Sequence, residues 1–261
     1  MSKKSEPSPE HMDDEIERLE AKFKEVAEDL GRLRQKLKTA TKERIHEIKD
    51  EWAGLSYRWF VIILGGILVF FIFSFFYYTV VGQYADARVL PASTDPFLDI
   101  LPVVDMTPVL SWGWFIAHLA AIFISLSYYP RRTPFMLLTF GLLIAIRTTF
   151  IILSPIGAPH GMLDMSRIDY IFSRLTGVLT FTNEFVFSAH TAIPFLFSLM
   201  FDIGWQKKLF LGVSIVMAAC VLLTRNHYTV DVLAAYFMAY SIYRLSHYIF
   251  RRLTASKESN A

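Results

Sequence analysis

The sequence predicts an all-α polytopic membrane protein with six transmembrane helices, preceded by a cytoplasmic coiled-coil helix. Hydrophobic residues make up 54% of the 261-residue chain, against about 45–50% in an ordinary soluble domain. They are concentrated from Trp59 onward, whereas the preceding residues are polar and densely charged. We therefore expect three parts: a charged N-terminal segment (1–56), a membrane domain (57–250) and a polar cytoplasmic tail (251–261).

In the N-terminal segment, apolar residues recur at alternating intervals of three and four positions. They are Ile16, Leu19, Phe23, Val26, Leu30, Leu33 and Leu37. This spacing is the heptad pattern of a coiled coil. The stripe then shifts around the helix at Thr41, Ile45, Ile48 and Trp52, a slip that locally unwinds a supercoil. We expect a homo-oligomer formed through this helix; the alternative is a single amphipathic helix packed on the membrane domain or lying at the lipid surface.

Six apolar segments follow, and a helix needs about 20 residues to cross a bilayer. The segments are 59–82, 110–129, 134–153, 185–201, 209–224 and 230–250. The fourth and fifth are short, so their ends are the least well defined. Pro130 and Pro134 bracket the second connection, where a helix should break.

Pairs of basic residues set the expected orientation, because cytoplasmic loops are enriched in Lys and Arg. With six spans, three pairs fall on one side together with both termini: Arg131 and Arg132, Lys207 and Lys208, Arg251 and Arg252. We expect that side to be cytoplasmic, with 83–109, 154–184 and the turn before the sixth span on the periplasmic or lumenal face. The lack of an Asn-x-Ser/Thr sequon favours a bacterial inner membrane over a secretory-pathway membrane.

Charge and cysteine content exclude several other classes of protein. A formal net charge of +2 gives no reason to expect a nucleic acid as partner. Cys220 is the single cysteine, so neither an intrachain disulfide nor a thiolate metal site can form. We expect no metal and no cofactor.

Three ionisable residues lie at the edges of predicted spans, on the same face of the membrane. His190 is near the outer end of the fourth span, and His227 and Asp231 are at the outer start of the sixth. Because helical residues four apart share a face, Asp231 can accept a hydrogen bond from one nitrogen of His227 and make the other more basic. His190 could exchange protons with an alcohol on the far side of a phosphate. This constellation can transfer a phosphoryl group without a metal.

The alternative interpretation is structural, with two interfacial histidines and an aspartate that stabilises a helix start. It would suffice for any one of the three residues. Ionisable groups are rare and costly within membrane segments, so the joint pattern favours a functional site.

The strings around these residues resemble a known family. The string from Glu184 to Thr191, with Ser188-Ala189-His190-Thr191 at its end, resembles the Asp-Tyr-x-x-Ser-Gly-His-Thr motif of sphingomyelin synthases. The string from His227 to Val232 resembles their His-Tyr-Thr-x-Asp-Val motif. Arg147, followed by the segment from Leu153 to Pro159, is similar to the arginine and Leu-Pro-Val-Pro-Gly turn at the end of their third helix. The wider group is the type-2 phosphatidic acid phosphatase superfamily.

The resemblance implies roles for the matching residues. His227 would be the nucleophile, Asp231 would orient it and balance its charge, and His190 would act as general acid and then base. The sequence departs from the family at Ala189, which replaces a glycine, and at Glu184, which replaces an aspartate. The Lys-x6-Arg-Pro signature of the soluble and bacterial phosphatases is missing, so their phosphate-clamping residues cannot be carried over.

Candidate phosphate-binding residues must therefore be found in this chain itself. Arg147 lies about 10 Å below the outer end of its predicted helix at about 1.5 Å per residue, and a buried arginine needs an anion. A bound phosphate would serve; pairing with Glu184 or Asp231 is the structural alternative. Arg225, two residues before His227, is a second candidate with a plain surface role as its alternative, and Ser188 is the third.

We expect a lipid phosphotransferase that moves a phospho-headgroup from a phospholipid to a lipid alcohol of ceramide or diacylglycerol type. Three other functions stay open. A lipid phosphatase would use the same residues with water as acceptor, and a non-catalytic scaffold would use only the coiled coil. A haem protein would need paired histidines, but His118, His190, His227 and His247 are at unsuitable depths on the six-span topology.

Overall fold

The structure is a computed structural model that describes residues 9–53, 57–88, 90–154, 156–164, 169, 174, 181 and 183–255. The chain divides into two compact units, Met1–Gly54 and Leu55–Ala261. All regular elements in the described ranges are helices, which confirms the all-α class for that part of the chain.

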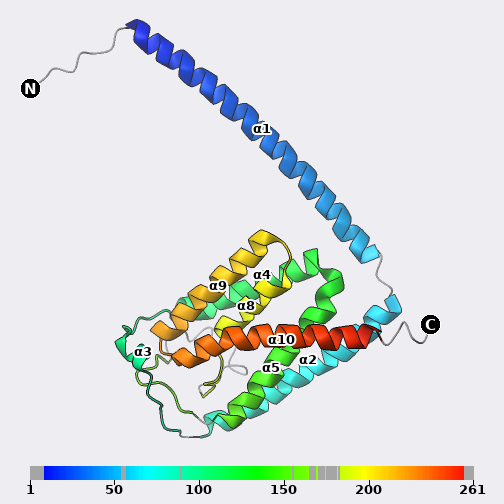
Figure 1. The fold of residues 1–261 in the computed structure, drawn as a ribbon, viewed down its shortest axis with the longest axis vertical. Helices are drawn as coiled ribbons and strands as arrows, with labels where there is room; N and C mark the ends of the chain where they lie inside the picture. Colours follow the sequence, from blue (N-terminus) through cyan, green and yellow to red (C-terminus); the bar gives the residue numbers. More distant parts are fainter. Residues whose placement is uncertain are drawn as a thin grey trace, which may run out of the picture. The chain divides into compact units, whose positions relative to one another are not determined.

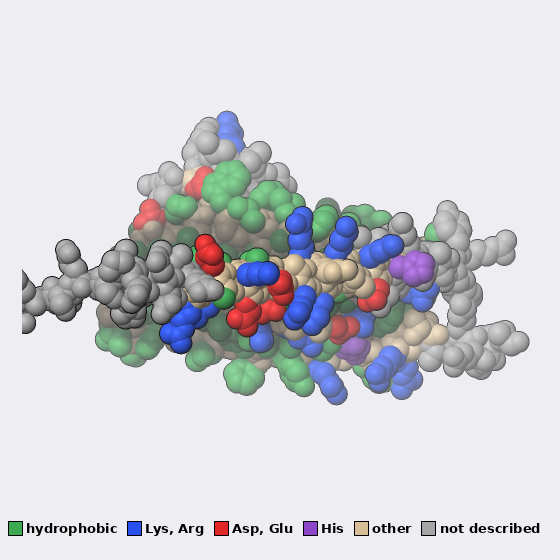
Figure 2. Space-filling view, turned by 90° about the horizontal axis from the view of Figure 1, so that it is seen from above, with side chains coloured by type: hydrophobic (Ala, Val, Ile, Leu, Met, Phe, Trp, Pro, Cys, Tyr) green, Lys and Arg blue, Asp and Glu red, His purple; other side chains and the backbone are tan. Residues whose placement is uncertain are grey.

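The first unit contains one helix, α1 (Pro9–Ala53), of 45 residues (Figure 1). Proline at its first position suits a helix start, and Glu, Lys, Leu and Ala, all strong helix formers, fill most of its length. Five apolar side chains of the heptad stripe are between 49% and 74% exposed: Leu19, Phe23, Val26, Leu30 and Leu33. Side chains of both charge signs are interspersed along the face seen in Figure 2. Pairing through this stripe stays a prediction.

In the membrane unit, α5 (Thr133–Leu153) packs between α2 (Tyr57–Asp86) and α10 (Thr229–Ala255). Helices α2 and α5 lie side by side along much of their length (Figure 1). Gly141 of α5 permits this close approach, because a Cβ there would lie 2.9 Å from the Phe70 ring of α2.

The innermost helix is α8 (Ala189–Met200), which contacts α4 (Trp114–Tyr128), α9 (Gly204–Leu223) and α10. Ala192 and Leu196 of α8 are fully buried in the main hydrophobic core. Short elements lie between the long helices: α3 (Pro96–Ile100), the π-helix η1 (Val109–Gly113) and the 3-10 helix η2 (Pro130–Arg132).

Four helices are long and apolar enough to cross a membrane within the part of the chain that the structure describes. They are Ile63–Asp86, Val109–Tyr128, Pro130–Leu153 and Gly204–Leu223. They correspond to the first, second, third and fifth predicted spans, whereas α10 has the length of a span but is less apolar. The six-span topology thus stays a prediction.

The fourth predicted span, 185–201, differs most from the structure. Its helix has only 12 residues, or about 18 Å at about 1.5 Å per residue, because Ser188 and Phe201 at its two ends are extended. The fifth begins at Gly204 rather than at 209, so Lys207 and Lys208 lie in the first turns of α9 and not in a loop.

Gly31 offers a test of α1. The position is exposed, and nothing lies within 4 Å of a Cβ placed there. Since glycine in a helix interior costs about 0.5–1 kcal/mol relative to alanine, we expect Gly31→Ala to stabilise α1 by that amount. Amide hydrogen exchange in α1 should slow in the full-length protein. Unchanged or faster exchange would contradict a continuous α1 helix at this position.

Candidate active site

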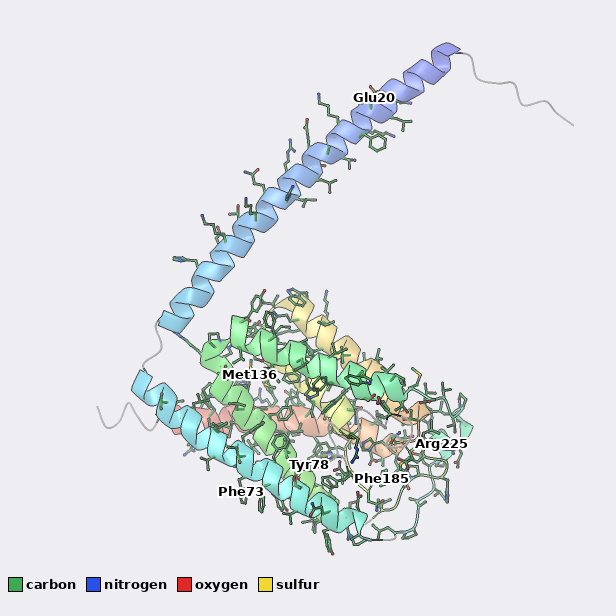
Figure 3. The ribbon with its side chains drawn as sticks, turned by 180° about the vertical axis from the view of Figure 1, so that it is seen from behind. Glu20, Phe73, Tyr78, Met136, Phe185 and Arg225 are labelled. Atoms are coloured by element: carbon green, nitrogen blue, oxygen red, sulfur yellow. The ribbon has the colours of Figure 1, made fainter. Side chains whose placement is uncertain are left out.

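Both sequence strings and Arg147 come together at one end of the membrane unit. Helix α5 ends there, and α8 and α10 begin there. In Figure 3, Tyr78 and Phe185 lie toward the end of the helices where Arg225 is also found, and Met136 lies toward the other end.

The start of α10 brings His227 and Asp231 into contact. His227 Nδ1 lies 3.2 Å from Asp231 Oδ2, and the same oxygen accepts a hydrogen bond from the Tyr228 amide at 3.1 Å. Both residues are only 6% exposed. A proton on Nδ1 would be donated to the carboxylate, which would leave the lone pair on Nε2 to react. A buried, oriented imidazole of this kind is suited to nucleophilic chemistry.

A backbone hydrogen bond joins the two strings. The Ser188 amide donates to the main-chain oxygen of Asp231 at 3.1 Å, and the carbonyl of Ser188 begins the hydrogen bonding of α8 by accepting from Ala192 at 2.8 Å. The first turns of α8 and α10 are therefore held together. His190, in the first turn of α8, lies within electrostatic reach of His227 and Arg147.

The ring of His190 also packs on α4. Its centroid is 5.3 Å from that of Trp114, whose ring in turn packs, tilted, on His118 with centroids 3.8 Å apart. His118 Nδ1 lies 2.8 Å from the Trp114 carbonyl oxygen, inside the bundle. His247 packs on Phe135 near the start of α5, far along the bundle from the site.

Arg147 forms the ion pair with Glu184 that was one of its expected alternatives. Its NH1 group lies 2.7 Å from Glu184 Oε2, NH2 donates to the Glu184 carbonyl at 3.2 Å, and Nε donates to the Phe187 carbonyl at 3.2 Å. The residue is 5% exposed, and Tyr78 interacts with both members of the pair. Arg147 thus holds the segment before α8 against α5, while contact with a phosphate stays a hypothesis.

Arg225 lies at a tight turn with a φ of 56°. Its NH1 group donates to the His160 carbonyl at 2.8 Å, and NH2 donates to the Leu98 carbonyl at 3.4 Å. These bonds connect the turn before α10 with helix α3 and with the segment around His160, at the site end of the unit. A phosphate contact from Arg225 is likewise a hypothesis.

Two hydroxyl groups beside His190 are buried without a hydrogen-bond partner among the described residues. They are Ser188 Oγ and Thr191 Oγ1, and both residues are fully buried. Buried polar atoms nearly always have a partner, so these hydroxyls are suited to a ligand. Ser188 was expected at the site; Thr191 was overlooked, although it belongs to the same string.

Asp95 is a further residue that sequence reasoning missed. Its Oδ2 accepts a hydrogen bond from the Thr229 amide at 2.6 Å, and its Oδ1 accepts one from the Thr229 hydroxyl at 3.0 Å. It also caps α3 through the amides of Phe97 and Leu98. Burial alone would raise the pKa of Asp95, but the hydrogen bonds from Thr229, Leu98 and Phe97 hold that pKa below its ordinary value.

The Tyr228 hydroxyl, next to His227, forms hydrogen bonds with two neighbouring loops. It accepts from the Ser93 amide and donates to the Gly157 carbonyl, both at 2.9 Å. Gly157 is packed so closely on the backbone that a Cβ there would overlap the Leu90 carbonyl oxygen. The loops around Ser93 and Gly157 thereby fix the start of α10.

No group of three or more His, Cys, Asp or Glu side chains within the described ranges is placed to hold a metal ion. The groups suited to phosphoryl transfer are therefore side chains: the imidazoles of His190 and His227, the carboxylate of Asp231 and the neighbouring hydroxyls.

Comparison with known proteins identifies one similarity. The family model of the PAP2 superfamily C-terminal region matches residues 169–248, a range that contains His190, His227 and Asp231. No curated protein and no solved structure matches the chain. The match supports a membrane phosphatase or phosphotransferase acting on lipids in general, and Arg147 and α1 lie outside it.

Asp95→Ala should lower stability by about 1 kcal/mol, the usual cost of losing a helix cap. Because the folded-state pKa of Asp95 lies below the ordinary value of 3.8, its contribution is present above about pH 4 and is lost as the pH falls through the folded-state pKa. Thermal unfolding in detergent should therefore separate the variant from wild type at pH 7 and less so near pH 3. The exposed Asp99 on the same short helix gives the control variant Asp99→Ala. If wild type were more stable than Asp95→Ala by the same amount at every pH, the stabilising role of the ionised Asp95 carboxylate would be contradicted.

Arg147→Met should destabilise the protein by about 3–5 kcal/mol, because it leaves the Glu184 carboxylate buried and unpaired. The double variant Arg147→Met/Glu184→Leu removes both charges and should recover much of that stability. Chemical denaturation of both variants measures this. If the double variant is as unstable as the single one, the ion pair is not the main role of Arg147.

Proposed function

We propose that the protein is an integral-membrane lipid phosphotransferase that moves a phospho-headgroup from a phospholipid to a lipid alcohol, of ceramide or diacylglycerol type, through a phosphohistidine. The observation that carries the proposal is the buried His227–Asp231 pair, whose helix start is bonded to that of the helix bearing His190. Supporting this, the matched family region includes all three residues.

The reaction would proceed in two displacements. His227 Nε2 attacks phosphorus, the bond between phosphorus and the diacylglycerol oxygen breaks, and His190 gives its proton to that oxygen. His190 then takes a proton from the acceptor hydroxyl, whose oxygen attacks phosphorus and releases His227. Asp231 orients the ring throughout and balances the charge that develops on it.

Three residues are proposed to bind the phosphate. Ser188 Oγ is buried and without a partner among the described residues, and it lies beside the start of α8, where helix amides favour an anion. Arg147 supplies positive charge nearby and keeps N–H groups beyond those bonded to Glu184 and Phe187. Arg225, at the tight turn before α10, is the third.

The family match supports hydrolysis as well as transfer. A lipid phosphatase would use the same three catalytic residues, with water taking the place of the lipid alcohol. The two functions differ in how well the site excludes water after the first step.

The proposed topology has six spans, cytoplasmic termini and the site on the periplasmic face of a bacterial inner membrane, or on a lumenal face. The start of α5 packs on the end of α10, where the rings of Phe135 and Phe250 have centroids 5.7 Å apart. Arg132 and Arg252 therefore belong to the end of the bundle opposite His227, and Arg132 pairs with Asp202 after α8 at 2.6 Å. This arrangement supports a cytoplasmic location for the basic pairs.

His227→Ala and His190→Ala should each nearly abolish turnover. We expect losses of about 10²–10⁴-fold for the acid–base residue, and Asp231→Asn should be severely impaired because the ring loses its charged acceptor. The assay is transfer of a labelled headgroup in detergent or vesicles, with His247→Ala as the matched histidine control. Wild-type rates in the His227 variant would rule out the phosphohistidine route.

Chelation should leave activity intact, since the proposed chemistry uses only side chains. The measurement is turnover in EDTA and after addition of Mg²⁺, Mn²⁺ or Zn²⁺. Activity that is lost on chelation and restored by one of these ions would contradict the histidine mechanism.

The destination of the phosphorus separates transfer from hydrolysis. Purified protein would be incubated with a headgroup-labelled phospholipid and either ceramide or a diacylglycerol whose acyl chains differ from those of the donor. We expect the label in a new lipid, formed only when the acceptor is present. A water-soluble labelled product, released equally with and without acceptor, would identify a hydrolase.

A further inference from the structure

Helix α1 carries an apolar stripe that neither proposed reaction uses. Leu19, Phe23, Val26, Leu30 and Leu33 are all exposed on this single helix. In heptad notation Phe23 and Leu30 occupy a positions, and Leu19, Val26 and Leu33 occupy d positions. Such a stripe is the surface that a second helix covers in a coiled coil.

An antiparallel second copy would place an apolar residue opposite an apolar residue in every layer of the stripe. In such a pair, a residues of one helix meet d residues of the other. Aligned about the point between Lys24 and Glu25, the layers are Met12 with Leu37, Ile16 with Leu33, Leu19 with Leu30 and Phe23 with Val26, each occurring twice. The alignment uses every apolar residue of the stripe from Met12 to Leu37. It ends there because the next a position is occupied by the charged residue Arg44.

The flanking charges distinguish this alignment from a parallel one. Antiparallel helices bring g positions opposite g and e opposite e. Three of the four facing pairs are of opposite sign, namely Glu15 with Lys36, Lys22 with Asp29, and Asp13 with Arg34; the fourth, Glu20 with Ala27, is neutral in effect. A parallel pair would instead bring g positions opposite e positions. It would have one repulsive pair, Glu15 with Glu20, and one attractive pair, Asp29 with Arg34. Since e and g charges set the orientation of coiled coils, the sequence of α1 fits the antiparallel form.

We propose that two copies of this chain pair through residues 12–37 of α1 as an antiparallel coiled coil. The C-terminal ends of the two helices, at Ala53, then lie about 85 Å apart at about 1.5 Å per residue. The pairing therefore connects two copies of the chain through α1 alone.

Cysteine cross-linking in the full-length protein tests the orientation. Leu19→Cys and Leu30→Cys chains with different tags would be co-expressed and oxidised. We expect a disulfide between the two kinds of chain, because Leu19 and Leu30 share a layer. Neither variant should cross-link to itself when expressed alone, since the two copies of residue 30 would lie about 16 Å apart along the axis, too far for a disulfide. The wild-type chain, whose single cysteine is buried, is the background control.

A charge exchange provides the second test. Lys22→Glu should weaken dimerisation, because glutamate would face Asp29 twice, and Lys22→Glu/Asp29→Lys should restore it. In a parallel dimer, the glutamate of Lys22→Glu would face Ala27, so the single variant would dimerise normally. The double variant would dimerise less well, because the lysine at position 29 would face Arg34. Lys24→Glu makes the same charge change on the outer face of the helix and should leave the dimer unchanged. The readout is dimer fraction against concentration in detergent or nanodiscs.

Three results would overturn the proposal: self-cross-linking of the Leu30→Cys chain, a double charge variant that dimerises no better than Lys22→Glu, or a wild-type protein that stays monomeric at all concentrations. Loss of lipid transfer in a dimerisation variant is not expected. The outcome is therefore independent of whether the proposed function is correct.

Discussion

The hydrogen bonds accepted by Asp231 hold the reactive end of the bundle together. Its carboxylate accepts from His227 and from the Tyr228 amide, and its main-chain oxygen accepts from the Ser188 amide. One residue therefore fixes the orientation of the His227 imidazole and the positions of the first turn of α10 and the start of α8. The proposed reaction needs such a link, because small displacements of either helix would separate two groups that are proposed to act on one phosphorus atom.

The Arg147–Glu184 pair offsets the free-energy cost of burying a charged side chain within a helical bundle. A lone arginine at 5% exposure would be very costly. The pair and two main-chain carbonyls satisfy it, and in doing so they fix the irregular segment that leads into α8. Arg147 therefore helps to position Ser188 and His190, whether or not it also contacts a phosphate as proposed.

The long helices, and the proximity of Asp231 to His227, could be predicted from sequence because their signals are local. Apolar runs reveal α2, α4, α5 and α9, and a spacing of four places Asp231 beneath His227. The contribution of Asp95 could not be predicted, since it lies 134 residues from Thr229 and its local pattern indicates only the cap of a short helix. The length of α8 was also missed, because the apolar residues from Phe185 to Phe187 continue the hydropathy of a helix while their backbone is not helical.

The shortness of α8 has a consequence for the lipid. Its C-terminal end is fixed at the level of the α4–α5 connection, where Tyr129 and Arg132 bind residues 202 and 203. From that level, a helix of about 18 Å reaches only part of the way through a hydrocarbon layer of about 30 Å. His190, in the first turn of α8, would therefore lie below the opposite boundary of that layer. In the proposed reaction, the headgroup of a donor phospholipid would have to enter the bilayer to reach His190.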